Sequence, residues 1–167
     1  KAALAKSKYT PEQLKAFNLD IAAVSTSEPF KNIALLLSMN LKKLGLNAQV
    51  KPARWADIVS AATKPETAFD LAIYYDSARL GHPSQLMMYY TKAGWGTAYP
   101  GGGIYWSNPK VDELLAKAAL QDDNSAEQKS LYCEADKLIA AEAPAIFSHA
   151  ALRTLPHWNY LKGFRAD

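Results

Sequence analysis

Residues 68–90 read A-F-D-L-A-I-Y-Y-D-S-A-R-L-G-H-P-S-Q-L-M-M-Y-Y, and this stretch determines how the rest of the chain is interpreted. Its first part, residues 69–75, has the apolar and aromatic composition of a β-strand. A polar turn follows at residues 76–82, and Pro83 suits the first turn of a helix that continues through Tyr90. In α/β folds, ligands tend to bind at the turn after the carboxyl end of a strand. The stretch therefore predicts a strand, a binding turn and a helix.

A strand–helix–strand unit is predicted before this stretch. Residues 19–26 have a strand pattern, and Pro29 opens a long helix whose apolar residues recur at helical spacing. Gly45 suits the end of that helix, and residues 46–51 then alternate as a second strand. The crossover between the two strands is expected to be right-handed. The predicted buried stripe of the helix consists of Ile33, Leu36, Leu37, Leu41 and Leu44.

The remainder of the chain alternates between helices and irregular segments. A short helix is predicted at residues 54–62, and a glycine-rich loop at residues 91–105 excludes a long helix or a central strand. Asn108 and Pro109 open a helix with a predicted inner face of Val111, Leu114, Leu115, Ala118 and Ala119. A capping box at Ser125 opens another helix, to about residue 141, and residues 145–152 return as a strand. We expect an α/β fold with a mixed sheet flanked by helices.

The composition indicates a globular domain with a substantial core. The chain has 167 residues, of which 49% are hydrophobic and 21% charged, and no apolar run reaches the roughly 18 residues of a membrane span. The net charge of +3 comes from scattered lysines and arginines, so the dense basic stripe typical of nucleic-acid binding is absent. Cys133 is the one cysteine, so the chain cannot form an internal disulfide. We predict that Cys133 is a semi-buried helix residue.

No pattern of catalytic or metal-binding residues is present in the sequence. The three histidines lack zinc-ligand spacing, and no serine lies in a nucleophile elbow. Asp70 and Asp76 are about 20 Å apart on an extended strand, which is too far for them to act together. The residues therefore give no specific support for catalysis, and we predict a protein that is not an enzyme. Two competing hypotheses are a small hydrolase that uses Asp76 and His82, and a structural interaction module that uses the aromatic loop.

The predicted ligand site surrounds the turn at residues 76–82. Arg79 is either a solvated turn residue or a salt-bridge partner of Asp76, or it is a guanidinium fork that grips a ligand carboxylate or another anion. The aromatic residues of the glycine-rich loop either hold that loop on the core or line a pocket mouth, and the sequence does not separate these alternatives. The candidate ligand-binding residues are Tyr75, Asp76, Arg79, His82, Trp95, Tyr99 and Trp106.

The order of five motifs resembles that of a known family. Residues 41–51 read L-K-K-L-G-L-N-A-Q-V-K and are followed by P-A-R-W-A-D-I and then by F-D-L-A-I-Y-Y at residues 69–75. Y-W-S-N-P-K-V-D-E-L-L-A-K-A and S-L-Y-C-E-A-D-K-L-I-A-A-E-A-P-A-I-F come next. This order is similar to that of the carboxy-terminal lobe of the family 5 extracellular solute-binding proteins. These are the dipeptide, oligopeptide and nickel receptors of ABC importers, and the resemblance covers residues 2–163.

The resemblance implies a two-lobed receptor that closes on a small solute, peptide-like or carboxylate-bearing, and delivers it to a membrane permease. It implies a bacterial protein that is periplasmic, or extracellular and membrane-anchored, and that works as a monomer without a cofactor or nucleic acid. Residues 1–167 would form a single α/β domain, as a fragment from which the first lobe is absent.

The resemblance also implies which charge meets the ligand. In peptide-binding relatives, a Trp and then an Asp follow the F-D strand, and the Asp pairs with the amino group of the peptide. Alignment on Pro83 places Arg79 at the Asp position and implies a ligand with a carboxylate or another anionic group. If a gap is allowed, Asp76 takes the acidic role and ordinary peptides remain ligands.

Overall fold

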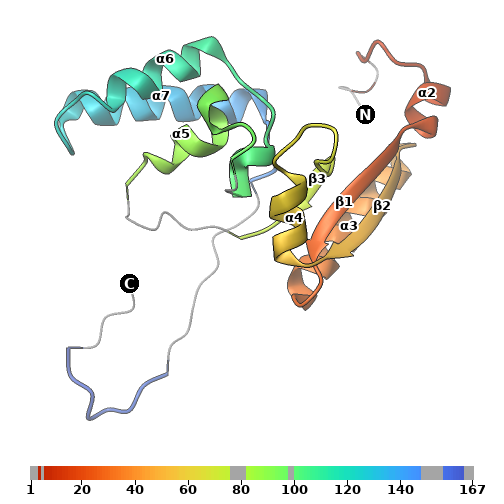
Figure 1. Ribbon diagram of the computed structural model, residues 1–167, viewed down its shortest axis with the longest axis horizontal. Coiled ribbons are helices and arrows are strands. Elements are labelled where there is room, and N and C mark those ends of the chain that lie inside the picture. Colours follow the sequence, from red (N-terminus) through yellow and green to blue (C-terminus); the bar gives the residue numbers. More distant parts are fainter. Residues whose placement is uncertain (1–3, 5, 76–81, 98–99, 148–155, 164–167) are drawn as a thin grey trace.

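A parallel β-α-β unit forms the amino-terminal half of the molecule (Figure 1). The computed structural model describes residues 4, 6–75, 82–97, 100–147 and 156–163. Strand β1 (Asn18–Val24) leads through helix α3 (Glu28–Lys43) to strand β2 (Asn47–Ala53). The two strands pair in parallel along their whole length, from Asn18 opposite Asn47 to Val24 opposite Ala53. The predicted strand–helix–strand unit is confirmed.

A third strand completes the described sheet. Strand β3 (Leu71–Ile73) pairs in parallel with the other side of β1, so the strand order is β2-β1-β3. The prediction of a strand over residues 69–75 is correct in place but too long, since only three residues pair with β1. The predicted α/β fold with a sheet flanked by helices is confirmed, and its three described strands are all parallel. The mixed character of the sheet stays a prediction.

Helix α3 covers one face of this sheet, but its buried side differs from the predicted stripe. Ile21 and Ala23 of β1 pack with Ala34, and the hydroxyl of Ser38 donates to the carbonyl of Ala48 at 2.8 Å. Leu37 and Leu41 are partly buried against this core, as predicted. Leu36 and Leu44 are instead 61% and 38% exposed. The prediction was wrong for Leu36 because the described sheet is too narrow to cover the whole apolar side of this 16-residue helix. It was wrong for Leu44 because this residue follows Lys43, the last residue of α3.

Gly45 ends α3 in a Schellman motif. The N–H of Leu46 donates to the carbonyl of Leu41 at 3.1 Å, and the N–H of Gly45 donates to that of Lys42 at 3.0 Å. Gly45 has φ +89°, a left-handed conformation that L side chains rarely adopt. A Cβ at this position would meet no atom within 4 Å, so its cost would come from the backbone alone.

Gly45→Ala is expected to lower the free energy of unfolding by about 1 kcal/mol, since alanine is strained in the left-handed region. Gly45→Asn is the matched control, because asparagine tolerates this conformation better, and it is expected to cost less. Urea denaturation of the two variants measures the difference. Equal loss in both variants would show that the left-handed backbone is not what Gly45 supplies.

Helices dominate the chain after β2 (Figure 1). Two of them are short: α4 (Trp55–Ala61) and α5 (Gln85–Tyr90). The other two, α6 (Pro109–Ala118) and α7 (Ala126–Glu142), pack side by side as an antiparallel pair. Helix α5 begins at Gln85, so Pro83 lies in the turn before the helix and not at its first position. Another short helix, α2 (Pro11–Ala16), precedes β1 and begins with a complete capping box at Thr10.

The α6–α7 pair has its own apolar core. Leu115 and Ile139, fully or almost fully buried, lie at its centre, and Tyr89 and Tyr90 of α5 complete it. Most of the predicted inner face of α6 is confirmed, but Ala119 is exposed because α6 ends at Ala118. Cys133 is also exposed, in contrast to the semi-buried position predicted from its neighbours.

Gln128 holds the turn between α6 and α7. Its backbone N–H donates to the hydroxyl of Ser125 at 3.1 Å, which is half of the predicted capping box. Its side-chain oxygen accepts from the N–H of Asn124, and its amide nitrogen donates to the carbonyl of Ala118 at 3.2 Å. The buried amide therefore bonds both ends of the turn, in place of the reciprocal capping bond.

The glycine-rich loop contains two short 3-10 turns, η1 (Lys92–Gly94) and η2 (Pro100–Gly103). Residues 145–147 have no regular structure, and the rest of the strand predicted at residues 145–152 lies outside the described residues. In Figure 1, residues 156–163 lie apart from both halves of the molecule. No helix in the described part of the chain is long and apolar enough to cross a membrane.

Candidate functional site

The carboxyl ends of the three strands meet at one edge of the sheet, because all three strands are parallel. The segments that follow them are residues 25–27 after β1, residues 54–55 after β2 and residues 74–75 after β3. We call these segments the strand-end edge. The N–H of Ser25 donates to the carbonyl of Ala53 at 2.8 Å, which ties the first segment to the end of β2. This edge is where ligands bind in open α/β sheets.

Aromatic side chains dominate the strand-end edge. The rings of Trp55 and Tyr74 lie 6.0 Å apart at an interplanar angle of 52°. Trp55 is 39% exposed and Tyr75 is 49% exposed, so both present ring surface to solvent. Exposed aromatic rings on a rigid scaffold are suited to binding apolar or planar groups, since each offers a large contact area at a low entropic cost.

Arg54 provides a fixed positive charge at the same edge. Its Nε and Nη2 donate to the two carboxylate oxygens of Asp57, each at 2.8 Å. The hydrogen bond and charge of Asp57 raise the pKa of Arg54. In turn, the hydrogen bond from Arg54 lowers the pKa of the Asp57 carboxyl. The guanidinium of Arg54 is therefore already bound by the Asp57 carboxylate of α4. The geometry of this pair is the bidentate one that guanidinium groups also use for ligand carboxylates.

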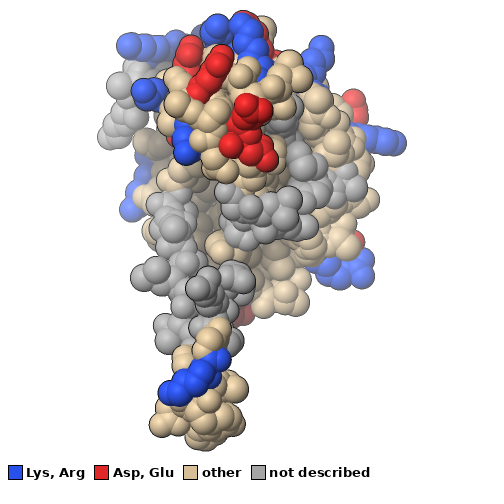
Figure 2. Space-filling model, turned by 90° about the vertical axis from the view of Figure 1, so that its left-hand side faces the viewer, with Lys and Arg blue, Asp and Glu red and all other residues tan. Residues whose placement is uncertain are grey.

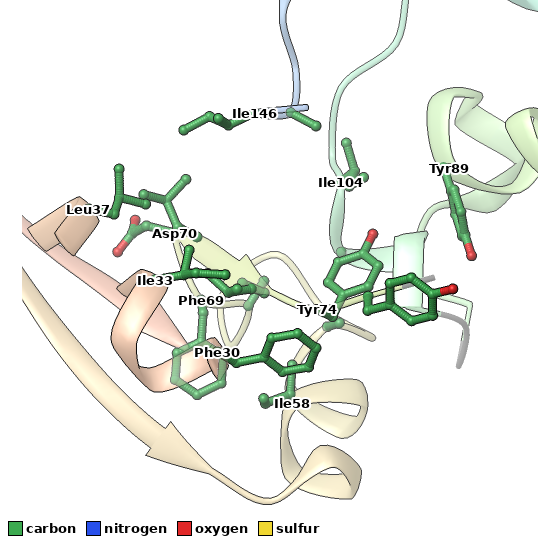
Figure 3. Close-up of a pocket in the computed structure, with 18 of the residues that line it drawn as sticks. Phe30, Ile33, Leu37, Ile58, Phe69, Asp70, Tyr74, Tyr89, Ile104 and Ile146 are labelled. Atoms are coloured by element: carbon green, nitrogen blue, oxygen red, sulfur yellow. The ribbon is translucent and has the colours of Figure 1, made fainter. Parts of the chain in front are cut away.

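A wide cavity opens from the strand-end edge and runs along β3 (Figure 3). It has a volume of about 1010 Å³, and we call it the edge cavity. Phe30, Ile33 and Leu37 of α3 line one side, and Ile58 of α4 lies below them in Figure 3. Its far side is formed by residues 103–106, by Tyr89 and Tyr90 of α5 and by residues 144–147. The described lining is mostly apolar, with one acidic side chain, Asp70, at the end opposite the strand-end edge.

Two tyrosines of this lining stay protonated near neutral pH. Burial raises the pKa of the Tyr90 phenol, and the charge of Asp136 adds to that effect. The pKa of Tyr105 is raised by burial and by Glu66. Both phenols therefore remain neutral, and neither adds a negative charge to the cavity wall.

Hydrogen bonds hold the aromatic loop on the body of the molecule. The hydroxyl of Tyr105 donates to the carbonyl of Ala62 at 2.8 Å, and the indole N–H of Trp95 donates to the carbonyl of Trp106 at 3.1 Å. The indole N–H of Trp106 reaches the carboxylate of Glu142 at the end of α7, also at 3.1 Å. Because Tyr105 and Trp106 line the edge cavity as well, the loop has both of the roles that the sequence left open.

The predicted site residues do not all lie together. Tyr75 and Trp106 line the edge cavity, at different sides of it. Trp95 lies behind the wall, with its ring 5.8 Å from that of Tyr105, and is not a lining residue. Three further predictions, Asp76, Arg79 and Tyr99, lie outside the described residues and stay predictions.

His82 lines a second, smaller cavity of about 300 Å³, next to α7. Its ring meets that of Tyr132 edge to face, with centroids 5.9 Å apart. Its Nδ1 accepts from the N–H of Ser84 at 3.2 Å, and its Nε2 lies 3.7 Å from a carboxylate oxygen of Asp123. These contacts anchor the end of the predicted binding turn to the helical half and give His82 a packing role.

Sequence reasoning missed two residues of the strand-end edge, Trp55 and Tyr74. Each lies within a few residues of the carboxyl end of a strand, and that position is readable from the sequence once the strands are located. The missing information was the strand order, because β1 lies between β2 and β3 and brings Trp55 and Tyr74 together.

The charges of the described residues form neither a metal site nor a basic stripe. Among these residues, no group of three His, Cys, Asp or Glu side chains is placed to hold a metal ion. Figure 2 shows one face of the molecule, on which the Asp and Glu side chains gather near the upper end. The Lys and Arg side chains of that face are scattered and do not form the dense positive patch of nucleic-acid-binding proteins.

Comparison with solved structures identifies the class of fold. The chain has the fold of one part of the periplasmic binding proteins associated with ABC transporters. It matches HbpA2 from Haemophilus parasuis with a TM-score of 0.70 at 24% identity, over 86% of this chain and 27% of HbpA2. No protein-family model matches the sequence, and no curated protein matches it. The resemblance predicted from the motifs is confirmed at the level of the fold.

Two further structures with this fold contain ligands. DppA from Helicobacter pylori, a periplasmic binding protein in complex with the peptide STSA, matches with a TM-score of 0.67 at 23% identity, over 80% of this chain and 27% of DppA. AgaA from A. tumefaciens R10, in complex with agropinic acid, matches with a TM-score of 0.70 at 21% identity, over 86% of this chain and 28% of AgaA. The chain thus spans little more than a quarter of the length of these proteins.

Proposed function

We propose that this chain is the ligand-binding lobe of an extracellular solute-binding protein that serves an ABC importer. The observation that carries the proposal is the fold, which DppA and AgaA share over at least 80% of this chain. In our proposal the lobe captures a small peptide-like or carboxylate-bearing solute in the periplasm or at the outer face of the membrane. The other lobe belongs to the rest of the protein, and a membrane permease receives the solute.

The strand-end edge supports the position of the ligand in this proposal. In a two-lobed receptor the ligand lies between the lobes, and each lobe offers the edge at which its strands and its helix amino termini converge. Trp55, Tyr74 and Tyr75 present aromatic surface there, and the amino terminus of α3 at Ser27 lies at the same edge. The partial positive charge of a helix amino terminus favours an anionic group.

The hydrolase hypothesis has no support from the described residues. It requires His82 to be available to a substrate beside Asp76. The ring of His82 is instead packed on Tyr132 and lies close to Asp123, which places it against α7. We therefore propose binding without catalysis. From the family resemblance we also propose that the protein needs no cofactor and works as a monomer.

The full-length protein tests this proposal in a thermal-shift screen against peptides, amino-acid derivatives, sugars and nickel complexes. A ligand at 100 times its Kd stabilises a protein by about 2.7 kcal/mol, which raises the Tm by several degrees. We expect a peptide or a carboxylate-bearing solute to give such a shift. A shift with sugars or nickel complexes alone would contradict the proposed solute class, and turnover of any screened compound would contradict the proposed binding role.

Variants of the predicted turn distinguish the two charge assignments in the same screen. If Arg79→Ala abolishes the shift and Asp76→Ala does not, the ligand presents an anionic group to Arg79. The reverse result assigns a ligand amino group to Asp76. A shift that survives both substitutions would remove the turn from the proposed site.

Trp55→Ala is expected to weaken ligand binding by the full-length protein at least tenfold, because truncation of a central aromatic contact typically costs more than about 1.4 kcal/mol. Isothermal titration calorimetry with the ligand from the screen measures this change. Trp158→Ala is the matched control, since Trp158 is 72% exposed and does not line the edge cavity. Equal affinities for the two variants would exclude Trp55 from the site.

A further inference from the structure

Glu142 is placed against the usual rules for the end of a helix. It is the last residue of α7, and the carboxyl end of a helix carries a partial negative charge that disfavours an acidic side chain. The next residue, Ala143, has φ +49°, a left-handed conformation that residues with a Cβ rarely adopt. Two unfavourable features at adjacent positions indicate that Glu142 has a role outside its own helix.

The Glu142 carboxylate accepts two hydrogen bonds from one segment of the chain. Its Oε2 accepts from the indole N–H of Trp106 at 3.1 Å, and its Oε1 accepts from the side-chain amide of Asn108. Asn108 also caps α6, because its side-chain oxygen accepts from the N–H of Lys110 at 2.8 Å. Hydrogen bonds to an ionised acceptor are the stronger kind. Glu142 therefore joins the end of α7 to the segment between the cavity wall and α6.

The backbone of Trp106 is held by the glycine-rich loop and its immediate neighbours. Its N–H donates to the carbonyl of Ile104 at 2.8 Å, and its carbonyl accepts from the indole N–H of Trp95 at 3.1 Å. These bonds do not act on the Trp106 side chain. The ring meets that of Tyr90 edge to face, with centroids 6.3 Å apart, and its N–H donates to Glu142. The bond to Glu142 therefore contributes to the orientation of the ring.

The ring that Glu142 orients belongs to the wall of the edge cavity. The adjacent wall residue, Tyr105, is held from another direction, since its hydroxyl donates to the carbonyl of Ala62, which follows α4, at 2.8 Å. Two consecutive aromatic residues are thus bonded to the ends of two different helices. A side chain that is already ordered binds a ligand more tightly, because it loses less conformational freedom on binding.

We propose that Glu142 is a positioning residue of the edge cavity, which holds the Trp106 ring in the orientation that contacts the ligand. The inference rests on the proposed function, because it assigns the Trp106 ring to ligand contact. Glu142 does not itself line the cavity and acts through the indole N–H. Its second hydrogen bond, to Asn108, stabilises the start of α6.

The indole N–H signal of Trp106 in nuclear magnetic resonance spectra of the full-length protein tests the first step without a ligand. Glu142→Ala removes the acceptor, so we expect this signal to shift and its exchange with solvent to become about tenfold faster. The indole signal of Trp158, which is 72% exposed, is the reference and should not change. An unchanged Trp106 signal would overturn the proposal.

A double-mutant cycle with the ligand from the screen tests the second step. Glu142→Ala is expected to weaken binding by the full-length protein about fivefold, because the ligand must then order the Trp106 ring. Trp106→Phe retains an aromatic ring but removes the indole N–H, so the addition of Glu142→Ala to this variant should cause no further loss. An equal loss in both backgrounds would overturn the proposal, since Glu142 would then act without the indole.

Asn108→Ala and Glu134→Ala are the matched controls. Asn108→Ala removes the other donor to Glu142 and the cap of α6, so the Tm should fall while the affinity stays within about twofold. Glu134 is an exposed glutamate of the same helix that lines neither cavity, and its substitution should change neither quantity. A loss of affinity in Asn108→Ala as large as that in Glu142→Ala would overturn the proposal in favour of a purely structural role.

Two further measures keep the outcomes distinct. If Glu142→Ala does not fold, Glu142→Leu takes its place, because leucine retains the bulk of the side chain and offers no acceptor. If no screened solute binds the unmodified protein, the proposed function fails, while the Trp106 signal still decides whether Glu142 orients the ring.

Discussion

Leu115→Ala is expected to lower the free energy of unfolding by about 3 kcal/mol, which is typical of leucine truncation in a well-packed core. Leu115 is fully buried and lies at the centre of the core formed by α5, α6 and α7. The truncation removes apolar contacts and leaves a cavity that antiparallel helices cannot easily close. Urea denaturation monitored by circular dichroism measures the loss.

Leu120→Ala is the matched control for this prediction. Leu120 follows the end of α6 and is 85% exposed, so the same chemical change is expected to stay within about 0.5 kcal/mol. If both variants lose the same stability, the packing of α6 against α7 is not what stabilises this half of the molecule.

Gly102→Ala is expected to destabilise the protein by about 2–3 kcal/mol through overpacking inside the glycine-rich loop. A Cβ at this position would lie 2.1 Å from the carbonyl oxygen of Thr97 and 2.9 Å from its hydroxyl. The carbonyl of Gly102 accepts from the N–H of Gly96 at 3.0 Å, so the two sides of the loop cannot separate without the loss of that bond. We expect a Tm that is lower by several degrees, and faster amide exchange across the loop.

Ala93→Ser provides the control for the Gly102 variant. Ala93 belongs to the same loop and is exposed, so a hydroxyl there meets solvent and should hardly change the Tm. A Tm for Gly102→Ala equal to that of Ala93→Ser would show that the loop accommodates a side chain at Gly102. The close approach of Thr97 would then not determine the conformation of the loop.

The β-α-β unit was readable from the sequence because its signals are local. The spacing of apolar residues along α3, the glycine after its end and the alternation in β2 each depend on a few neighbouring residues. The exposure of Leu36 was not readable in this way. It depends on the number of strands in the sheet and on the position of β3 at its edge, and both are properties of the tertiary structure.

The candidate site was predicted in part, for a similar reason. The sequence located the turn after β3 and identified Tyr75, which lines the edge cavity. It did not pair Trp55 with Tyr74, since these residues meet only through the strand order. His82 is close to the predicted turn in sequence, but its partners Asp123 and Tyr132 come from the helical half, about forty to fifty residues later in the chain.

The most direct test of the central proposal is amide hydrogen exchange of the full-length protein with and without the solute found in the screen. The proposal predicts ligand-dependent protection at the strand-end edge, at residues 25–28, 54–56 and 74–75, and little change along the outer faces of α6 and α7. Protection that is confined to α6 and α7, with none at the strand-end edge, would contradict the assignment of this edge as the ligand-binding wall of the lobe.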